Sequence, residues 1–241
     1  MKFQVIAVTI AAAALSLGMA GSAGASLRSQ ASPAPQVTGA RLQTALLPAS
    51  AFGSGFTTFN RHNSGSTLRS SQAVIRPSNL SCVNFETYAF LAGFGNTAGA
   101  LDSINNPNPD FSDYPSVILG GDQYVLQFSS AGAAQSFYNR AYARYGQCSA
   151  FNEPDPADQT HVELTTQSLS STTIGNHKAF QLIQQADFAA FSGFDFYEVT
   201  AVVLAGTNVY TIDDVNGTND PISASLLGNL ISRVQALYKH H

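Results

Sequence analysis

The chain of 241 residues carries few charges: 11 Lys and Arg against 15 Asp and Glu give a net charge of −4, while 44% of the residues are hydrophobic. Such a chain lacks the basic surface that nucleic acids and anionic membranes attract, so we expect neither as a partner. The length is sufficient for one domain with a full hydrophobic core.

The first 25 residues have the composition of a secretory signal peptide. Lys2 precedes an apolar run over residues 5–17, and small residues follow up to Ala25. The apolar run is too short for a comfortable transmembrane helix. We therefore predict cleavage before Ser26, no membrane span after cleavage, and a secreted protein that is extracellular or associated with the cell wall. An uncleaved anchor is the alternative.

Residues 26–37 are polar and include two prolines, which predicts a disordered spacer. The folded domain is then expected over residues 38–241. It begins with a short helix over residues 39–46, with Thr38 as the cap and Pro48 as the stop.

The segment that follows is poor in regular patterns. Residues 50–78 are rich in Ser, Gly and Asn, and they predict a loop with at most one short strand. A helix is expected over residues 79–93. Residues 96–114 contain a turn cluster at 105–109, and no regular element is assigned to them.

The centre of the domain is a strand that leads directly into a helix. Residues 117–128 alternate apolar and polar side chains, which predicts the strand. Ser130 offers an N-cap, and the helix is expected over residues 131–145. Gly146 then stands at the C′ position.

Further strands are predicted over residues 161–169, 177–188, 194–205 and 207–214, with a tight hairpin at Gly206. Residues 152–156 before them predict an exposed acidic loop. A final helix is expected to begin at Pro221, with Asp220 as its N-cap.

The strand over residues 194–205 has one uniformly apolar face and one mixed face. This pattern is typical of an antiparallel sheet whose helices cover a single face. We therefore predict an α+β fold: one domain with a twisted antiparallel β-sheet and helices packed mainly on one face.

The two cysteines, Cys82 and Cys148, predict one disulfide in an exported chain. Two free thiols are the alternative.

Patterns typical of catalysis and of metal binding are missing from the sequence. There is no G-x-S-x-G elbow, and no histidine lies at ligand spacing from a cysteine. The acidic run over residues 213–220 departs from the register of a calcium loop. Glu163, Asp187 and Glu198 are the carboxylates considered for a glycosidase pair. We predict no enzyme activity, no catalytic residue, no metal and no cofactor.

The 16 Phe and 9 Tyr are a large aromatic content for a chain with so few charges. Most of them belong in a core, but some are expected to line an apolar cleft on the mixed sheet face. Residues 50–78 would fold over this face through Phe52, Phe56 and Phe59. The alternative is that these phenylalanines fill the core, as is expected for at least two of the three. The ligand-binding residues predicted on this basis are Tyr124, Phe196, Glu198, Thr200 and Tyr210.

The order of these landmarks resembles the PknH-like extracellular sensor domain, found on actinobacterial membrane kinases and in secreted or lipid-anchored proteins. The resemblance covers about residues 40–238. Its motifs are ALLP at 45–48, SC at 81–82, QYVLQFSSAGAAQSF at 123–137, YGQC at 145–148 and ISASLLGNLISRV at 222–234.

The resemblance implies an α+β fold with an antiparallel sheet, a cleft for an unidentified ligand, and no catalytic residue. Tyr145 stands where the family usually has Trp, and a second cysteine pair common in the family is absent. Only Cys82 and Cys148 therefore carry over, as the matching disulfide.

The sequence thus predicts a secreted, non-enzymatic, sensor-type domain whose partner is a small molecule, a lipid or a cell-wall ligand. Two alternatives remain: a secreted hydrolase with an unrecognised active site, and a structural or interaction module without a small-molecule site.

Overall fold

The computed structural model describes residues 36–63, 95–154, 161–187 and 193–239. All of these residues belong to one compact unit, Pro33–His241. The helix predicted over residues 79–93, and Cys82 with it, lies outside the described residues.

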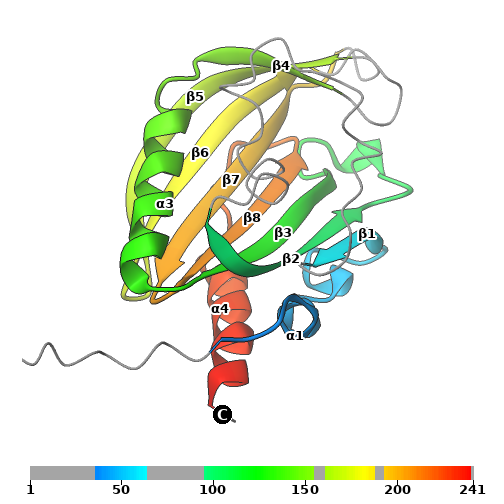
Figure 1. The fold of residues 1–241 in the computed structure, drawn as a ribbon. Helices are drawn as coiled ribbons and strands as arrows, with labels where there is room; N and C mark the ends of the chain where they lie inside the picture. Colours follow the sequence, from blue (N-terminus) through cyan, green and yellow to red (C-terminus); the bar gives the residue numbers. More distant parts are fainter. Residues whose placement is uncertain (1–35, 64–94, 155–160, 188–192, 240–241) are drawn as a thin grey trace, which may run out of the picture. The chain divides into compact units, whose positions relative to one another are not determined.

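Eight strands of the described chain form one antiparallel sheet in the order β1-β2-β3-β8-β7-β6-β5-β4 (Figure 1). The strands are β1 Thr57–Asn63, β2 Asn96–Asn105, β3 Ile118–Phe128, β4 Ala150–Pro154, β5 His161–Ile174, β6 His177–Asp187, β7 Phe196–Ala205 and β8 Asn208–Asn216. The helices are α1 Gly39–Ala45, α3 Ala131–Tyr145 and α4 Ala224–Tyr238, with short 3-10 turns η1 Ala49–Ala51 and η2 Phe111–Asp113. This architecture confirms the predicted α+β fold with an antiparallel sheet.

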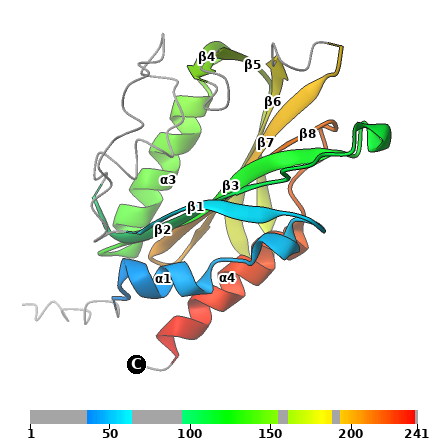
Figure 2. The same cartoon turned by 90° about the vertical axis from the view of Figure 1, so that its right-hand side faces the viewer.

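Two of the three described α-helices, α1 and α4, pack on the same face of the sheet (Figure 2). We call it the α1/α4 face. Alternate residues of β7 such as Val199 and Val203 point to it and are fully buried against Leu227 and Leu230 of α4. This is the uniformly apolar face predicted for β7, and its burial supplies most of the hydrophobic core.

Helix α3 packs on the other face, which we call the α3 face. Its residues Phe137, Tyr138 and Tyr145 are buried against the sheet. The ring of Phe180 on β6 lies 5.2 Å from that of Tyr138 and 5.9 Å from that of Tyr145, between ring centroids. These aromatic contacts fix α3 across β6.

The strand-to-helix unit at the centre of the chain forms as its local signals predict. The Ser130 side chain accepts a hydrogen bond from the backbone N of Ala133 at 3.2 Å, and α3 spans the residues expected. Gly146 differs, because its φ of −66° continues the right-handed conformation instead of the left-handed C′ turn. Gly206, with φ of +62°, forms the tight β7–β8 turn.

Other expectations were wrong. Residues 96–105 form β2, although Gly99, Asp102 and the asparagines at both ends have low strand propensity. Pairing with β1 on one side and β3 on the other decides the conformation there. Residues 150–154 form the edge strand β4, which includes residues 152–154 of the acidic loop expected over 152–156.

The final helix also begins later than predicted. Its N-cap is Ser223, so Asp220 and Pro221 precede α4 and do not cap or open it. Ile222 is buried in the core before the helix starts, which extends the apolar stripe of α4 by one residue.

Two buried glutamines of β3 hold the start of the domain on the α1/α4 face. Gln123 accepts from the backbone N of Leu47 at 2.8 Å and donates to its O at 2.7 Å. Gln127 bonds the backbone of Val37 in the same way. Each side-chain amide therefore pairs with a peptide group as a neighbouring strand would, on either side of α1.

Candidate functional site

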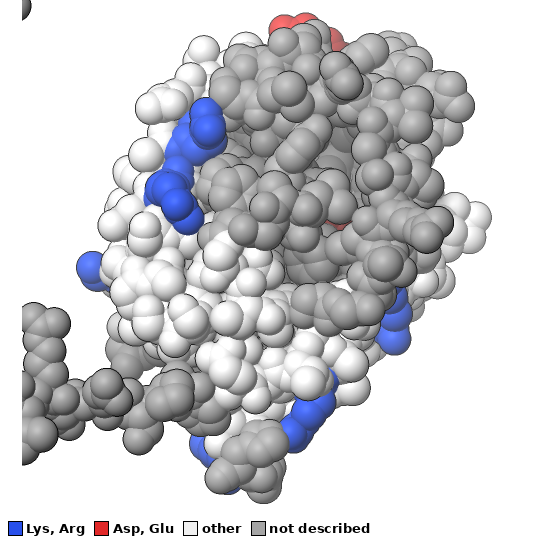
Figure 3. Space-filling model, in the orientation of Figure 1, with Lys and Arg blue, Asp and Glu red and all other residues white. Residues whose placement is uncertain are grey.

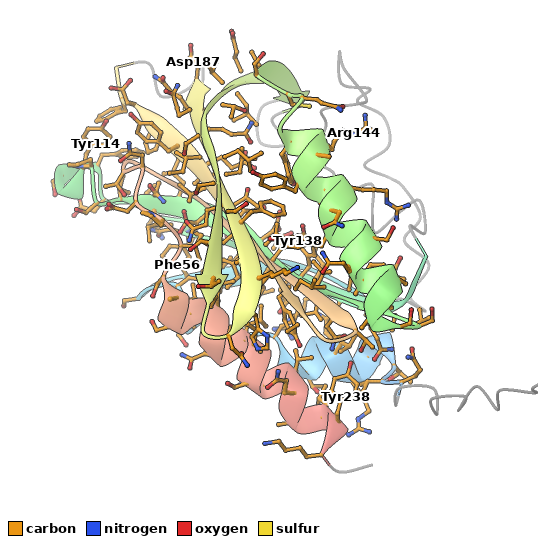
Figure 4. The ribbon with its side chains drawn as sticks, turned by 90° about the vertical axis from the view of Figure 1, so that its left-hand side faces the viewer. Phe56, Tyr114, Tyr138, Arg144, Asp187 and Tyr238 are labelled. Carbon is orange, nitrogen blue, oxygen red and sulfur yellow. The ribbon has the colours of Figure 1, made fainter. Side chains whose placement is uncertain are left out.

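The α3 face carries two apolar clusters with a polar band between them. The first lies under α3 and includes Tyr124, Phe128 and Phe180. The second lies at the far end and includes Phe196 and Leu164, together with Cys148 from the segment after α3. Figure 4 shows Tyr114, which packs on the second cluster, at the edge of the sheet and well separated from Tyr138 of the first cluster.

Four polar residues form a row across the sheet between these clusters. Ser103 on β2 is the register partner of Asp122 on β3, Asp122 is the partner of Asp213 on β8, and Asp213 is the partner of Thr200 on β7. We call these four residues the polar row. Thr200 is 2% exposed, Asp213 4% and Ser103 8%, so most of the row is buried.

Two carboxyl groups therefore face each other on adjacent strands. Like charges directly opposite one another destabilise a sheet, and burial adds to that cost. The backbone N of Asp122 donates to Oδ1 of Asp213 at 2.6 Å. Burial raises the pKa of Asp122, and the hydrogen bond from Ser103 only partly opposes this rise.

Two polar atoms at this row have no hydrogen-bond partner among the described residues. They are Oδ1 of Asp122 and Oγ1 of Thr211, and both are buried. Thr211 is fully buried, lies two residues before Asp213 on β8, and is the register partner of Tyr124. Unpartnered polar atoms of this kind need a structural or functional reason.

The sequence predicted part of this site. Tyr124, Phe196, Glu198 and Thr200 all lie on the α3 face: Tyr124 and Phe196 in the two apolar clusters, Glu198 and Thr200 on β7 between them. Tyr210 lies on the opposite face, in the core under α1 and α4, and is not part of the same surface.

Of the two arrangements considered for the three phenylalanines, Phe52 has the core one: it packs against the core of the α1/α4 face and does not fold over the α3 face. The side chain of Phe59 lies outside what the structure describes.

The sequence analysis missed Ser103, Asp122, Asp213 and Thr211. Asp122 follows Gly120 and Gly121, and a methyl group on Gly121 would lie 2.1 Å from the backbone O of Asp213. The pair of glycines was the local signal that two backbones approach closely here.

The far cluster contains several aromatic rings that pack together beside the polar row. The ring of Phe196 lies 6.1 Å from that of Tyr114 and 6.4 Å from that of Phe111, with both pairs in edge-to-face geometry. The Tyr114 hydroxyl is 3.0 Å from both the backbone N and the backbone O of Asp195, so it accepts from one and donates to the other. Phe194 covers the cluster and is 40% exposed.

The carboxylates considered for acid–base catalysis are not brought together. Glu163 and Asp187 are register partners on β5 and β6, and their neighbours Leu164 and Ala186 belong to the far cluster. The alternation along a strand therefore places Glu163 and Asp187 on the face opposite to Glu198.

The acidic run after β8 does not converge on a cation either. Asp213 and Asp214 point to opposite faces of the sheet, and Oδ1 of Asn216 accepts from the backbone N of Thr218 at 2.8 Å in a turn. Within the described ranges, no group of three or more His, Cys, Asp or Glu side chains is placed to hold a metal ion.

The cysteine that was predicted to form a disulfide is buried. Cys148 is 3% exposed in the far cluster. Its predicted partner, Cys82, lies outside the described residues, so the pairing stays a prediction. The helices that the structure describes include none with the length and apolar composition of a membrane span.

Comparison with solved structures shows a likeness of fold. The sequence matches no family model and no curated protein. Among solved structures, the chain is similar to the extracellular domain of PknH from Mycobacterium tuberculosis, with a TM-score of 0.56 and 15% identity. The match covers 86% of this chain and 99% of that domain. The chain therefore has a fold like that of the PknH extracellular domain.

Proposed function

We propose that this chain is an exported, non-enzymatic, sensor-type domain that binds a ligand on the α3 face, with the polar row as the floor of the binding site. The observation that carries the proposal is the buried polar row between two apolar clusters. Two oxygen atoms there, Oδ1 of Asp122 and Oγ1 of Thr211, lack hydrogen-bond partners among the described residues.

The two unpartnered atoms contribute no hydrogen bond to the fold. A buried polar atom without a hydrogen bond costs about 1–3 kcal/mol, and apolar side chains in the same positions would join the two clusters into one core. A ligand that hydrogen-bonds these atoms recovers that free energy, and a site of this kind commonly joins apolar walls to a few convergent polar groups.

The site proposed here is more polar than the apolar cleft expected from the sequence. Its walls are the aromatic clusters that contain Tyr124 and Phe196, and its floor includes Thr200 and the two aspartates of the polar row. This combination suits a small molecule, a lipid headgroup or a cell-wall fragment that presents polar groups on an apolar body.

Two observations support export. The first 25 residues have the pattern of a signal peptide, and residues 26–37 that of a spacer. The domain with the similar fold is an extracellular one.

Native mass spectrometry of the mature chain, purified from culture medium, tests the proposal. We expect a bound compound, and a thermal shift when that compound is returned to the stripped protein. Thr200→Val, which removes a hydroxyl from the floor and keeps the side-chain shape, should weaken binding at least tenfold. Thr172→Val, on an exposed position of β5, is the matched control and should leave binding unchanged.

Two results would overturn the proposal. One is the absence of any bound compound together with no thermal shift across panels of lipids, glycans and small polar molecules. The other is turnover of an ester, peptide or glycoside substrate that a single substitution in the polar row abolishes, because that result would make the chain an enzyme.

A further inference from the structure

The polar row has an acidic character that determines which ligand chemistry it fits. Asp122 and Asp213 oppose each other on β3 and β8, and Glu198 lies nearby on β7 of the same face. Figure 3 looks onto this face, and the basic side chains that are visible there lie toward its periphery. Helix α3 contributes buried tyrosines such as Tyr138 and Tyr145 to this face.

The acidic pair is accompanied by a second feature that points to a ligand. Thr211 is fully buried on the same face, beside Asp213, and its Oγ1 has no partner within the described residues. Oδ1 of Asp122 lacks a partner in the same way. A hydroxyl oxygen and a carboxylate oxygen on one surface are both acceptors, so together they fit a donor with more than one N–H.

We infer that the polar row recognises a positively charged nitrogen group, an ammonium or a guanidinium, and that its binding displaces a proton from Asp122. This inference rests on the function proposed above and specifies the charge of the ligand. A guanidinium offers several N–H donors in one plane and is weakly hydrated, which suits a mostly buried site. An organic cation fits better than a metal ion, because the described residues offer no group of three metal-ligating side chains here.

The proton balance follows from the burial of Asp122. In the free protein, burial favours the protonated carboxyl group, whose pKa is raised. A cation beside Oδ1 favours the carboxylate, so the carboxylic acid and the free cation give the carboxylate–cation pair and one released proton. The affinity for a cation must therefore rise with pH until the free carboxyl group is ionised.

A neutral or anionic ligand would give the opposite dependence on pH. A protonated Asp122 donates a hydrogen bond to a neutral acceptor, and ionisation removes that donor. An anion would be repelled by the carboxylate as the pH rises. The sign of the pH dependence thus separates a cation from both other ligand classes in the wild-type protein, without any substitution.

Methylguanidinium and methylurea are suitable probes, because they have nearly the same shape and differ in charge. We expect methylguanidinium to bind the full mature chain with an affinity that rises by up to tenfold per pH unit below the pKa of Asp122 and then levels. Calorimetry in two buffers of different ionisation enthalpy should show the release of about one proton at low pH. At high pH, methylurea should bind at least tenfold more weakly than methylguanidinium.

Asp122→Asn should weaken methylguanidinium binding at least tenfold and remove its pH dependence. Asp187→Asn, at an exposed position of β6 on the opposite face, is the control and should change neither. If Asp122→Asn does not fold, Thr211→Val serves in its place, because it removes the second acceptor. This variant should weaken the binding of methylguanidinium without changing the number of protons released.

The inference fails if the affinity for methylguanidinium falls or stays constant as the pH rises, or if methylurea binds as tightly at high pH. A natural ligand that is found bound but is neutral or anionic would overturn the inference and leave the proposed function standing. If nothing binds, the proposed function fails as well.

Discussion

Gln127 and Val37 form a closed pair of hydrogen bonds between a side-chain amide and a backbone peptide group. The backbone N of Val37 donates to Oε1 of Gln127 at 2.9 Å, and Nε2 of Gln127 donates to the backbone O of Val37 at 3.1 Å. The hydroxyl of Tyr238 in α4 donates to the same Oε1 at 2.6 Å. One fully buried side chain on β3 therefore joins the first and the last described segments of the chain.

Replacing this amide with an apolar group of similar size should destabilise the domain strongly. Gln127→Leu leaves the backbone groups of Val37 buried without partners, and we expect a loss of about 3 kcal/mol in the free energy of unfolding, measured by urea denaturation. Gln167→Leu, at an exposed position of β5, should change stability by no more than about 0.5 kcal/mol. Equal effects of the two substitutions would contradict the role assigned to Gln127.

Two glycines should respond to alanine in opposite directions. At Gly121 the added methyl group would lie 2.1 Å from the backbone O of Asp213, so β3 and β8 would have to separate. We expect a loss of about 3 kcal/mol or more. At Gly228, inside α4, no atom beyond the neighbouring residues and the backbone of the helix itself lies within 4 Å of that position, and alanine should stabilise the helix by about 1 kcal/mol.

The midpoints of urea unfolding measure both changes. A neutral Gly121→Ala would mean that β3 and β8 are farther apart in solution than described here, and that the carboxyl groups of Asp122 and Asp213 are less closely opposed.

Asp214 should make stability depend on pH. Burial raises its pKa from 3.8 to about 7, against the opposing hydrogen bond from Asn216. The folded state therefore holds the proton more tightly than the unfolded state, and folding loses stability as the pH rises from about 4 to about 7. Asp214→Asn removes this loss. The free energy of unfolding of the variant should therefore exceed that of the wild type by almost nothing at pH 4 and by as much as about 4 kcal/mol at pH 8.

Thermal unfolding across this pH range measures the gain. Asp220→Asn is the control, because that side chain is exposed after β8 and its substitution should give no such trend. A gain for Asp214→Asn that is equal at pH 4 and pH 8 would show that the carboxyl group is not desolvated by folding.

The predicted disulfide between Cys82 and Cys148 should contribute to stability through the long loop that it closes. Cys148→Ser and Cys82→Ser should each cost about 4 kcal/mol, and the double variant should cost little more than either one. The buried Cys148 also packs with Phe196 and Leu164. Peptide mapping without reduction checks the pairing, and two alkylatable thiols in protein from culture medium would contradict it.

The parts of the fold that were predicted well are those with strong local signals. Helix α3 has its cap in Ser130 and a buried face around Phe137, and the β7–β8 hairpin has Gly206 in the conformation that its turn requires. Strand β2 has no such signal. Its small and polar residues, such as Gly99 and Asp102, become a strand because β1 and β3 pair with them from both sides.

The same contrast explains the candidate site. Glu198 and Thr200 could be placed on one face from the alternation along β7 alone. Asp122 and Asp213 are 91 residues apart in the chain, and only the register between β3 and β8 brings them together. Tyr210 was assigned to the wrong face because alternation within one strand does not reveal how that strand is aligned with its neighbours.

The meeting of Val37 and Tyr238 at Gln127 means that the chain enters and leaves the folded domain at nearly the same point. A short linker between these two positions would close the domain into a ring with little change to its structure, and new ends opened in the turn at Gly175 would then give a circular permutant. For the same reason the domain can be inserted as a single unit into a surface loop of a host protein without forcing apart the two residues of the loop that flank the insertion.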